Sequence, residues 1–70
     1  MKRKAVIDRL REEARRRGFV FETEELTNHT AFYVGGHRST LKRHTEIDEI
    51  TAKAFWDQFA SVFGKGWWRS

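Results

Sequence analysis

The sequence contains no cysteine and no proline. Without cysteine the chain can form neither a disulfide framework nor a thiolate zinc site, so a hydrophobic core has to hold its fold together. No long apolar run is present, which argues against a membrane-spanning helix. The basic N-terminus leads into an amphipathic stretch rather than into the apolar segment of a secretion signal, so we expect a cytoplasmic protein.

The composition is that of one small folded domain. A chain of 70 residues lies near the lower limit for folding without cross-links, and its 39% hydrophobic content is enough for a small two-layer core. Eight of the 14 Lys and Arg residues lie within the first 17 residues, so the positive charge is concentrated on the first element. A polyanion is a plausible partner for such a segment, and a solvated helix face is the alternative.

Hydrophobic periodicity predicts one helix followed by three strands. Apolar residues recur with helical spacing over residues 2–17, and Gly18 ends that helix after a basic last turn. Residues 19–24, 29–34 and 37–42 alternate between apolar and polar, which is typical of half-buried strands. The apolar stripe of the helix consists of Val6, Ile7, Leu10 and Ala14.

The rest of the chain predicts a hairpin, a second helix and a short tail. Gly35 and Gly36 separate the last two strands, as in a two-residue hairpin turn. Asp48 is a good N-cap for a helix that Gly64 ends. The order α-β-β-β-α predicts an α+β domain over residues 1–64, with a three-stranded antiparallel sheet and both helices packed on one face. Residues 65–70 form an aromatic tail.

Alternation along the three strands separates an inward face from an open face. The inward set is Phe19, Phe21, Phe32, Val34 and Leu41. The open set is Val20, Glu22, His29, Ala31, Tyr33, Arg38, Thr40 and Lys42, and function is expected on this face.

His29 is the strongest candidate for chemistry on the open face. No His-Glu-x-x-His pair, serine elbow or glycine-rich phosphate loop occurs, so we expect no metal site and no cofactor. Imidazole titrates near pH 6.5, so it can take the 2′-hydroxyl proton of RNA while nearby cations stabilise the charge at phosphorus. The alternative for His29 is a plain solvated surface residue.

Four segments, in this order, resemble those of one known family. Residues 1–7 resemble its first helix, and residues 28–32 its Gly-Ser-His-x-x-Phe segment. Residues 43–47 with Thr51 resemble its Pro-x-His segment and the threonine that starts its last helix, and residues 64–69 resemble the tail of an actinobacterial and phage subgroup. On these segments the chain resembles the HicA toxins, the small mRNA-cleaving halves of HicA–HicB toxin–antitoxin pairs.

The resemblance implies a fold like that of double-stranded-RNA-binding domains, and metal-independent RNA cleavage with His29 as the catalytic residue. It also implies a HicB-like antitoxin that covers the open face. Thr27 and Asn28 stand where the family has Gly-Ser, and Lys42 stands where it has proline. The alternative is a non-catalytic module of the same fold that captures RNA or a host protein.

The remaining candidates are contacts to RNA or to a partner. The predicted RNA or phosphate contacts are Lys2, Arg3, Lys4, Arg38, Lys42, Arg43 and His44. The predicted partner contacts are Tyr33, Trp67 and Trp68, and packing over the helices is the alternative for at least one tryptophan. We expect His37, beside the turn, to be solvated.

Overall fold

The computed structural model describes residues 1–69 and confirms the α+β fold with its α-β-β-β-α order. Ser70, the last residue of the predicted tail, lies outside the described residues. The elements are α1 (Arg3–Arg16), β1 (Phe21–Glu25), β2 (His29–Val34), β3 (His37–Lys42), α2 (Glu49–Asp57), α3 (Ala60–Phe63) and the 3₁₀ turn η1 (Trp67–Arg69).

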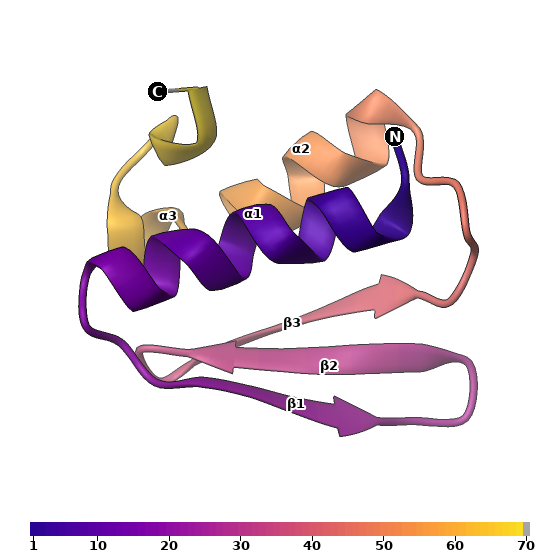
Figure 1. The fold of residues 1–70 in the computed structure, drawn as a ribbon, viewed down its shortest axis with the longest axis horizontal. Coiled ribbons are helices and arrows are strands. Elements are labelled where there is room, and N and C mark those ends of the chain that lie inside the picture. Colours follow the sequence, from indigo (N-terminus) through magenta and orange to yellow (C-terminus); the bar gives the residue numbers. More distant parts are fainter. Residues whose placement is uncertain (70) are drawn as a thin grey trace.

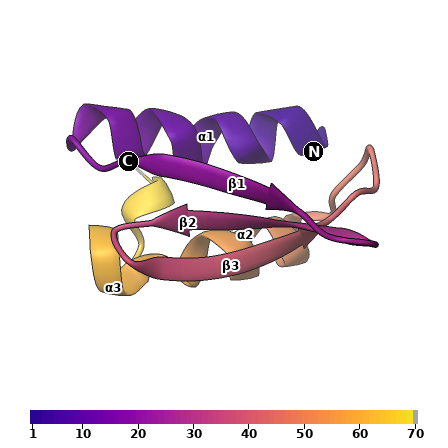
Figure 2. The ribbon, with the colours of Figure 1, turned by 90° about the horizontal axis from the view of Figure 1, so that it is seen from below.

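The three strands form one antiparallel sheet in the order β1-β2-β3. Gly35 and Gly36 both have positive φ angles, 57° and 78°, which makes the two-residue turn between β2 and β3 a tight one of the primed kind. The helices lie on one face of the sheet, and no helix or strand of residues 1–69 covers the other face (Figures 1 and 2). Within the described residues, no helix has the length and apolar character that a membrane crossing requires.

The N-terminus is tied to the segment that precedes α2. The Met1 ammonium donates to the Ile47 carbonyl at 2.8 Å, and the Ile47 amide donates back to the Met1 carbonyl at 2.7 Å. The amide of Arg3 donates to the Thr45 carbonyl at 2.8 Å. Because these contacts satisfy backbone groups at the start of α1, they fix the helix against residues more than 40 positions away.

The core lies between the sheet and the helices and is built largely of aromatic rings. Phe32 of β2 meets Phe55 of α2 edge to face, with ring centroids 5.3 Å apart. The Trp56 indole nitrogen donates to the Val6 carbonyl at 3.1 Å, so this ring joins α2 to α1. The buried apolar cluster is Val6, Leu10, Ala14, Phe32, Val34, Leu41, Ile47, Ala52, Phe55, Trp56, Phe59, Phe63 and Trp67.

Two predicted positions in the sheet need correction. Phe19 was expected in the core, but it precedes β1 and remains 38% exposed, with its ring edge against Phe63. Ala31 lies on the open face as predicted, between Glu24 and Thr40, yet it is 0% exposed. The longer side chains around it cover so small a residue, so Ala31 forms the floor of that face rather than part of its surface.

The predicted second helix is interrupted. α2 ends at Asp57 and α3 begins at Ala60, although the predicted stop at Gly64 is correct. At the break the Phe59 amide donates to the Trp56 carbonyl at 3.0 Å, a hydrogen bond of the tighter i→i−3 type.

The hairpin turn supplies the first testable prediction. A Cβ atom on Gly35 would lie 2.7 Å from Cγ1 of Val62, whereas one on Gly36 would meet nothing within 4 Å. We expect Gly36→Ala to lower the free energy of unfolding by about 1–2 kcal/mol, from positive φ alone. Gly35→Ala adds a clash with a stiff β-branched side chain, so its loss should be larger by about 1–3 kcal/mol. Urea unfolding of both variants measures the difference, and equal losses would contradict the close packing of Val62 on the turn.

Candidate active site

His29 is the first residue of β2 and lies directly opposite Lys42 of β3. Its side chain is half-buried and lines two open pockets, of about 460 and 380 Å³. Its place on the open face of the sheet follows the alternation predicted from the sequence, because Ala31 and Tyr33 share that face with it. The imidazole is therefore held by a strand but reachable from solvent.

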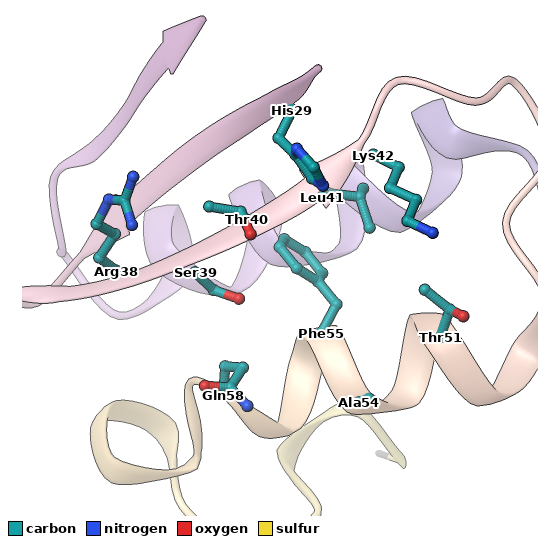
Figure 3. A pocket seen from close by; sticks show the side chains of 10 residues that line it. All are labelled: His29, Arg38, Ser39, Thr40, Leu41, Lys42, Thr51, Ala54, Phe55 and Gln58. Carbon is teal, nitrogen blue, oxygen red and sulfur yellow. The ribbon is translucent and has the colours of Figure 1, made fainter. Parts of the chain in front are cut away.

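The larger pocket, which we call the β3–α2 groove, runs between β3 and one side of α2 (Figure 3). β3 contributes the segment from Arg38 to Lys42, and His29 lies at the Lys42 end. The α2 side is formed by Thr51, Ala54, Phe55 and Gln58. The groove thus combines an imidazole, two cationic side chains and hydroxyl groups with the apolar side chains of Ala54 and Phe55.

The smaller pocket, which we call the loop pocket, lies at the end of the sheet where β2 begins and β3 ends. It shares His29 and Lys42 with the groove and adds the side chains of the two adjoining loops. These additional lining residues are Thr27, Asn28, Arg43 and His44. The structure therefore places the two predicted histidine sites, 29 and 44, on one pocket.

Arg43 and Arg3 hold this end of the sheet together. Arg43 forms an ion pair with Glu25 at 2.8 Å and donates to the Leu26 carbonyl. Arg3 donates to the Lys42 carbonyl at 2.9 Å and to the Thr30 hydroxyl at 2.7 Å. Their guanidinium groups are engaged by protein acceptors, so phosphate binding at these two positions would compete with structural contacts.

Lys42 differs from these arginines in that its ammonium group is available. The side chain is exposed and forms no ion pair within residues 1–69. Because it is directly across from His29, Lys42 is the cation best placed to meet an anion that contacts the imidazole.

Arg38 lies further along the open face, in a chain of hydrogen bonds. Its Nε donates to the Tyr33 hydroxyl at 3.2 Å, and that hydroxyl donates to Glu24 at 2.8 Å. The guanidinium carbon lies 5.9 Å from the centre of the Tyr33 ring. Tyr33, a predicted partner contact, is half-buried in this chain.

The N-terminal lysines do not line either pocket. Lys2 pairs with Glu46 at 3.1 Å, and Lys4 pairs with Asp8 at 2.7 Å, both at exposed positions. The hydrogen bond from Lys4 lowers the pKa of Asp8 below its usual value. These two predicted RNA contacts therefore lie outside the linings of both pockets, and each is paired with a carboxylate.

The two tryptophans of the tail have different environments. Trp67 is only 4% exposed, and its indole nitrogen donates to the Trp56 carbonyl at 2.9 Å, as in the packing alternative. Trp68 is half-buried and donates to Asp57 at 2.7 Å, with Lys53 and Arg69 near its ring. A partner that approaches this surface would contact Trp68 and not the ring of Trp67.

His37 is not the solvated residue that the sequence indicated. It is half-buried, and its ring meets Phe59 edge to face with centroids 5.5 Å apart. Its Nε2 atom is buried without a hydrogen-bond partner. The prediction was wrong because His37 starts β3 opposite Val34, which directs its side chain toward the helices.

Sequence reasoning did not identify the α2 side of the groove, apart from Thr51. This side combines apolar Ala54 and Phe55 with polar Thr51 and Gln58, each about one turn away. Such a mixed helix face gives no clear periodic signal in the sequence. Thr51 also completes the N-cap, because its amide and hydroxyl both donate to Asp48, and these bonds lower the pKa of Asp48. Within residues 1–69, no group of three His, Asp or Glu side chains is arranged to hold a metal ion.

Comparison with known proteins adds no relative to this picture. No family model matches the chain, and neither the curated proteins nor the solved structures contain a significant match.

Proposed function

We propose that the protein binds RNA across the two pockets that share His29 and cleaves it in a metal-independent reaction. The observation that carries the proposal is a solvent-accessible imidazole opposite an unpaired lysine, at the junction of two open pockets. The resemblance to HicA toxins agrees with this site, because its predicted catalytic residue is the same histidine.

The proposed reaction is an internal transesterification. His29 takes the proton of a ribose 2′-hydroxyl, and the resulting oxygen attacks the adjacent phosphorus atom. The bond from phosphorus to the 5′ oxygen of the next nucleotide breaks, and that oxygen takes a proton from water. Lys42 stabilises the additional negative charge on the phosphoryl oxygens during the attack. The products are a 2′,3′-cyclic phosphate and a 5′-hydroxyl end.

Neutralisation of a toxin of this kind requires that the imidazole be covered. We propose that a HicB-like antitoxin does so by binding over the open face and the loop pocket. Arg38 and Tyr33, on the same face as His29, would then be among its contacts.

The direct test is incubation of the purified protein with total RNA in the presence of a chelator. Fragments that end in 2′,3′-cyclic phosphate are the expected product, and mapping of their ends identifies the mechanism. If the RNA is bound but stays intact, the protein is a binding module and not a nuclease. If the protein neither binds nor cleaves RNA, the proposal is wrong.

Lys42 supplies a second prediction, on affinity. We expect Lys42→Ala to weaken RNA binding at all sequences and to reduce the salt slope of the binding constant by about 1, because one phosphate contact is lost. Lys65, exposed in the tail and absent from both pockets, provides the matched control. Binding isotherms at several salt concentrations measure the slope, and identical slopes for Lys42→Ala and Lys65→Ala would contradict a phosphate contact at Lys42.

A further inference from the structure

We infer that the free edge of β3 binds an extended acidic segment of a partner protein as a fourth strand of the sheet. β3 is the last strand in the order and pairs only with β2 among the described elements. Arg38, Thr40 and Lys42 are exposed along it. The inference concerns binding alone, so it does not depend on RNA cleavage.

The backbone of β3 has unused hydrogen-bonding groups on the side away from β2. Val34 and His37 flank the two-residue turn, so they exchange backbone hydrogen bonds with each other. In an antiparallel pair the bonded residues alternate, so every second residue of β3, counted from His37, bonds to β2 in the same way. The amides and carbonyls of the residues between them, 38, 40 and 42, therefore point outward. Arg3 donates to the Lys42 carbonyl, which confirms this direction for residue 42. Within residues 1–69, no hydrogen bond to the outward groups of Arg38 and Thr40 is present.

Space for a strand exists beside that edge. The β3–α2 groove of about 460 Å³ lies along β3, and α2 forms its far wall (Figure 3). A strand paired with β3 would direct alternate side chains toward Ala54 and Phe55, which favours small apolar residues at those positions. The other side chains would extend the open face of the sheet.

The charge of the edge selects the occupant. Arg38 and Lys42 lie on the open face, separated by Thr40, so a paired strand meets two cations four residues apart. Opposite charges on directly paired residues stabilise a sheet, and like charges destabilise it. The complementary segment therefore carries carboxylates at two positions four residues apart, with apolar residues on the alternate face.

The same charges disfavour a second copy of β3 as the occupant. Antiparallel pairing of two β3 strands about Thr40 would place Arg38 of one copy opposite Lys42 of the other. Cationic side chains on an exposed edge are a common device against such self-pairing. An acidic strand of a different protein turns this repulsion into attraction, which gives the edge selectivity.

A strand in this position would also cover one side of the proposed active site. His29 and Lys42 belong to the groove that the strand would fill, so its binding would compete with RNA there. This provides a physical route by which an acidic partner segment could control access to the imidazole.

The test uses the whole protein and a synthetic peptide with the core Glu-Val-Thr-Val-Glu, blocked at both ends. Its central threonine would pair with Thr40, and its two glutamates with Lys42 and Arg38. In the free protein we expect fast amide exchange at residues 38, 40 and 42 and slow exchange at 39 and 41. Saturating peptide should slow exchange at Arg38, Thr40 and Lys42 at least about tenfold, with the other surface amides unchanged.

Backbone methylation distinguishes strand addition from mere charge attraction. Methylation of the central threonine nitrogen removes a bond to Thr40 and should weaken binding about tenfold. Methylation of a neighbouring valine nitrogen, which points away from β3, is the matched control and should change affinity less than about threefold. The double variant Arg38→Glu with Lys42→Glu should bind the glutamate peptide about tenfold more weakly than the wild type does. The same variant should regain affinity for a peptide with lysines in place of the two glutamates.

Several outcomes would overturn the inference. Equal affinity for the two methylated peptides would show that the backbone edge is not used. Protection that appears at β1 instead of β3 would assign the segment to the other edge. Self-association of the protein without peptide, lost in the Arg38 and Lys42 variant, would assign the edge to a second copy. Cleavage of RNA is not part of this measurement, so a failure of the nuclease proposal leaves its result unaffected.

Discussion

Replacing His29 with alanine is expected to lower the rate of RNA cleavage about 100- to 10,000-fold, the usual contribution of a positioned acid–base group. RNA binding should change little, because we expect the affinity of the site to come from its lysine and arginine side chains. The half-buried side chain is held by β2 at the edge of both pockets, so its removal should leave the fold intact. Single-turnover cleavage at saturating protein measures the rate separately from binding.

His44→Ala is the informative comparison. His44 lines the loop pocket with His29 but lies in the exposed segment between β3 and α2, so its loss should weaken binding without removing the proton acceptor. We expect its cleavage rate at saturation to fall less than about tenfold. In cells without the proposed antitoxin, growth arrest by wild type and not by His29→Ala would agree with the same role. Equal arrest by both proteins would remove His29 from the mechanism.

Glu13→Gln should have a large effect on stability. Glu13 is 1% exposed, although carboxylate side chains are almost never fully buried unless they are paired. It receives hydrogen bonds from three guanidinium groups, those of Arg9 and Arg16 on α1 and of Arg17, the C-cap that follows the helix. A buried carboxylate with three cationic donors is the kind of group whose removal leaves its partners poorly satisfied.

These arginines also connect α1 to the C-terminal segment. Arg9 donates to the Trp67 carbonyl at 3.3 Å, and Arg17 donates to the Phe63 carbonyl at 2.9 Å. The Arg9 guanidinium carbon lies 5.2 Å from the centre of the Trp67 ring, and that of Arg17 lies 5.1 Å from the centre of the Phe63 ring. Glu13 therefore orients the side chains that hold α3 and η1 against the first helix.

We expect Glu13→Gln to lower the free energy of unfolding by about 2–3 kcal/mol, below the 3–5 kcal/mol of a fully buried pair because the arginines remain partly exposed. The midpoint temperature should fall by about 10–20 °C for a domain of this size. Glu12→Gln, at an exposed neighbouring position, is the matched control and should change stability by less than about 0.5 kcal/mol. Similar losses for the two variants would show that the arginine cluster contributes little.

The same carboxylate predicts a dependence of stability on pH. Burial raises the pKa of Glu13, but the hydrogen bonds from the three arginines outweigh it, so the pKa lies below its usual value of 4.5. The unfolded chain then binds the proton more tightly than the folded one. The stabilisation is fully present above about pH 4.5 and is lost as pH falls through the folded pKa. Urea midpoints measured from pH 7 to pH 3 should fall less steeply for Glu13→Gln than for wild type.

The fold was largely predictable because its signals are local. The helical stripe before Gly18, the alternation of the strands and the Gly35-Gly36 turn each act within a few residues. Alternation predicted that His29 and Lys42 lie on the open face, and the two-residue turn accounts for the register that pairs them in the structure. The errors came where a pattern ran past its element, as at Phe19, or where neighbours covered a small residue, as at Ala31.

The candidate site was predictable only in part, for a physical reason. A pattern of residues gives the face on which a side chain lies, but not the partner that it meets. Arg3 and Lys42 are 39 residues apart in the chain and in contact in the fold, and Arg43 meets Leu26 in the same way. Both arginines were predicted to contact phosphate, and packing at the end of the sheet engages them with protein acceptors.

The amino-acid sequence by itself determined the order of the elements, the pairing of the strands and the face that carries His29, because each depends on residues close together in the chain. Only the tertiary structure decided which charges are free. It buried Glu13 among arginines, left Lys42 without an ion pair among residues 1–69 and placed α2 beside β3 to form a groove. Those outcomes depend on how the helices and the sheet pack across the core, and no local pattern of residues specifies that packing.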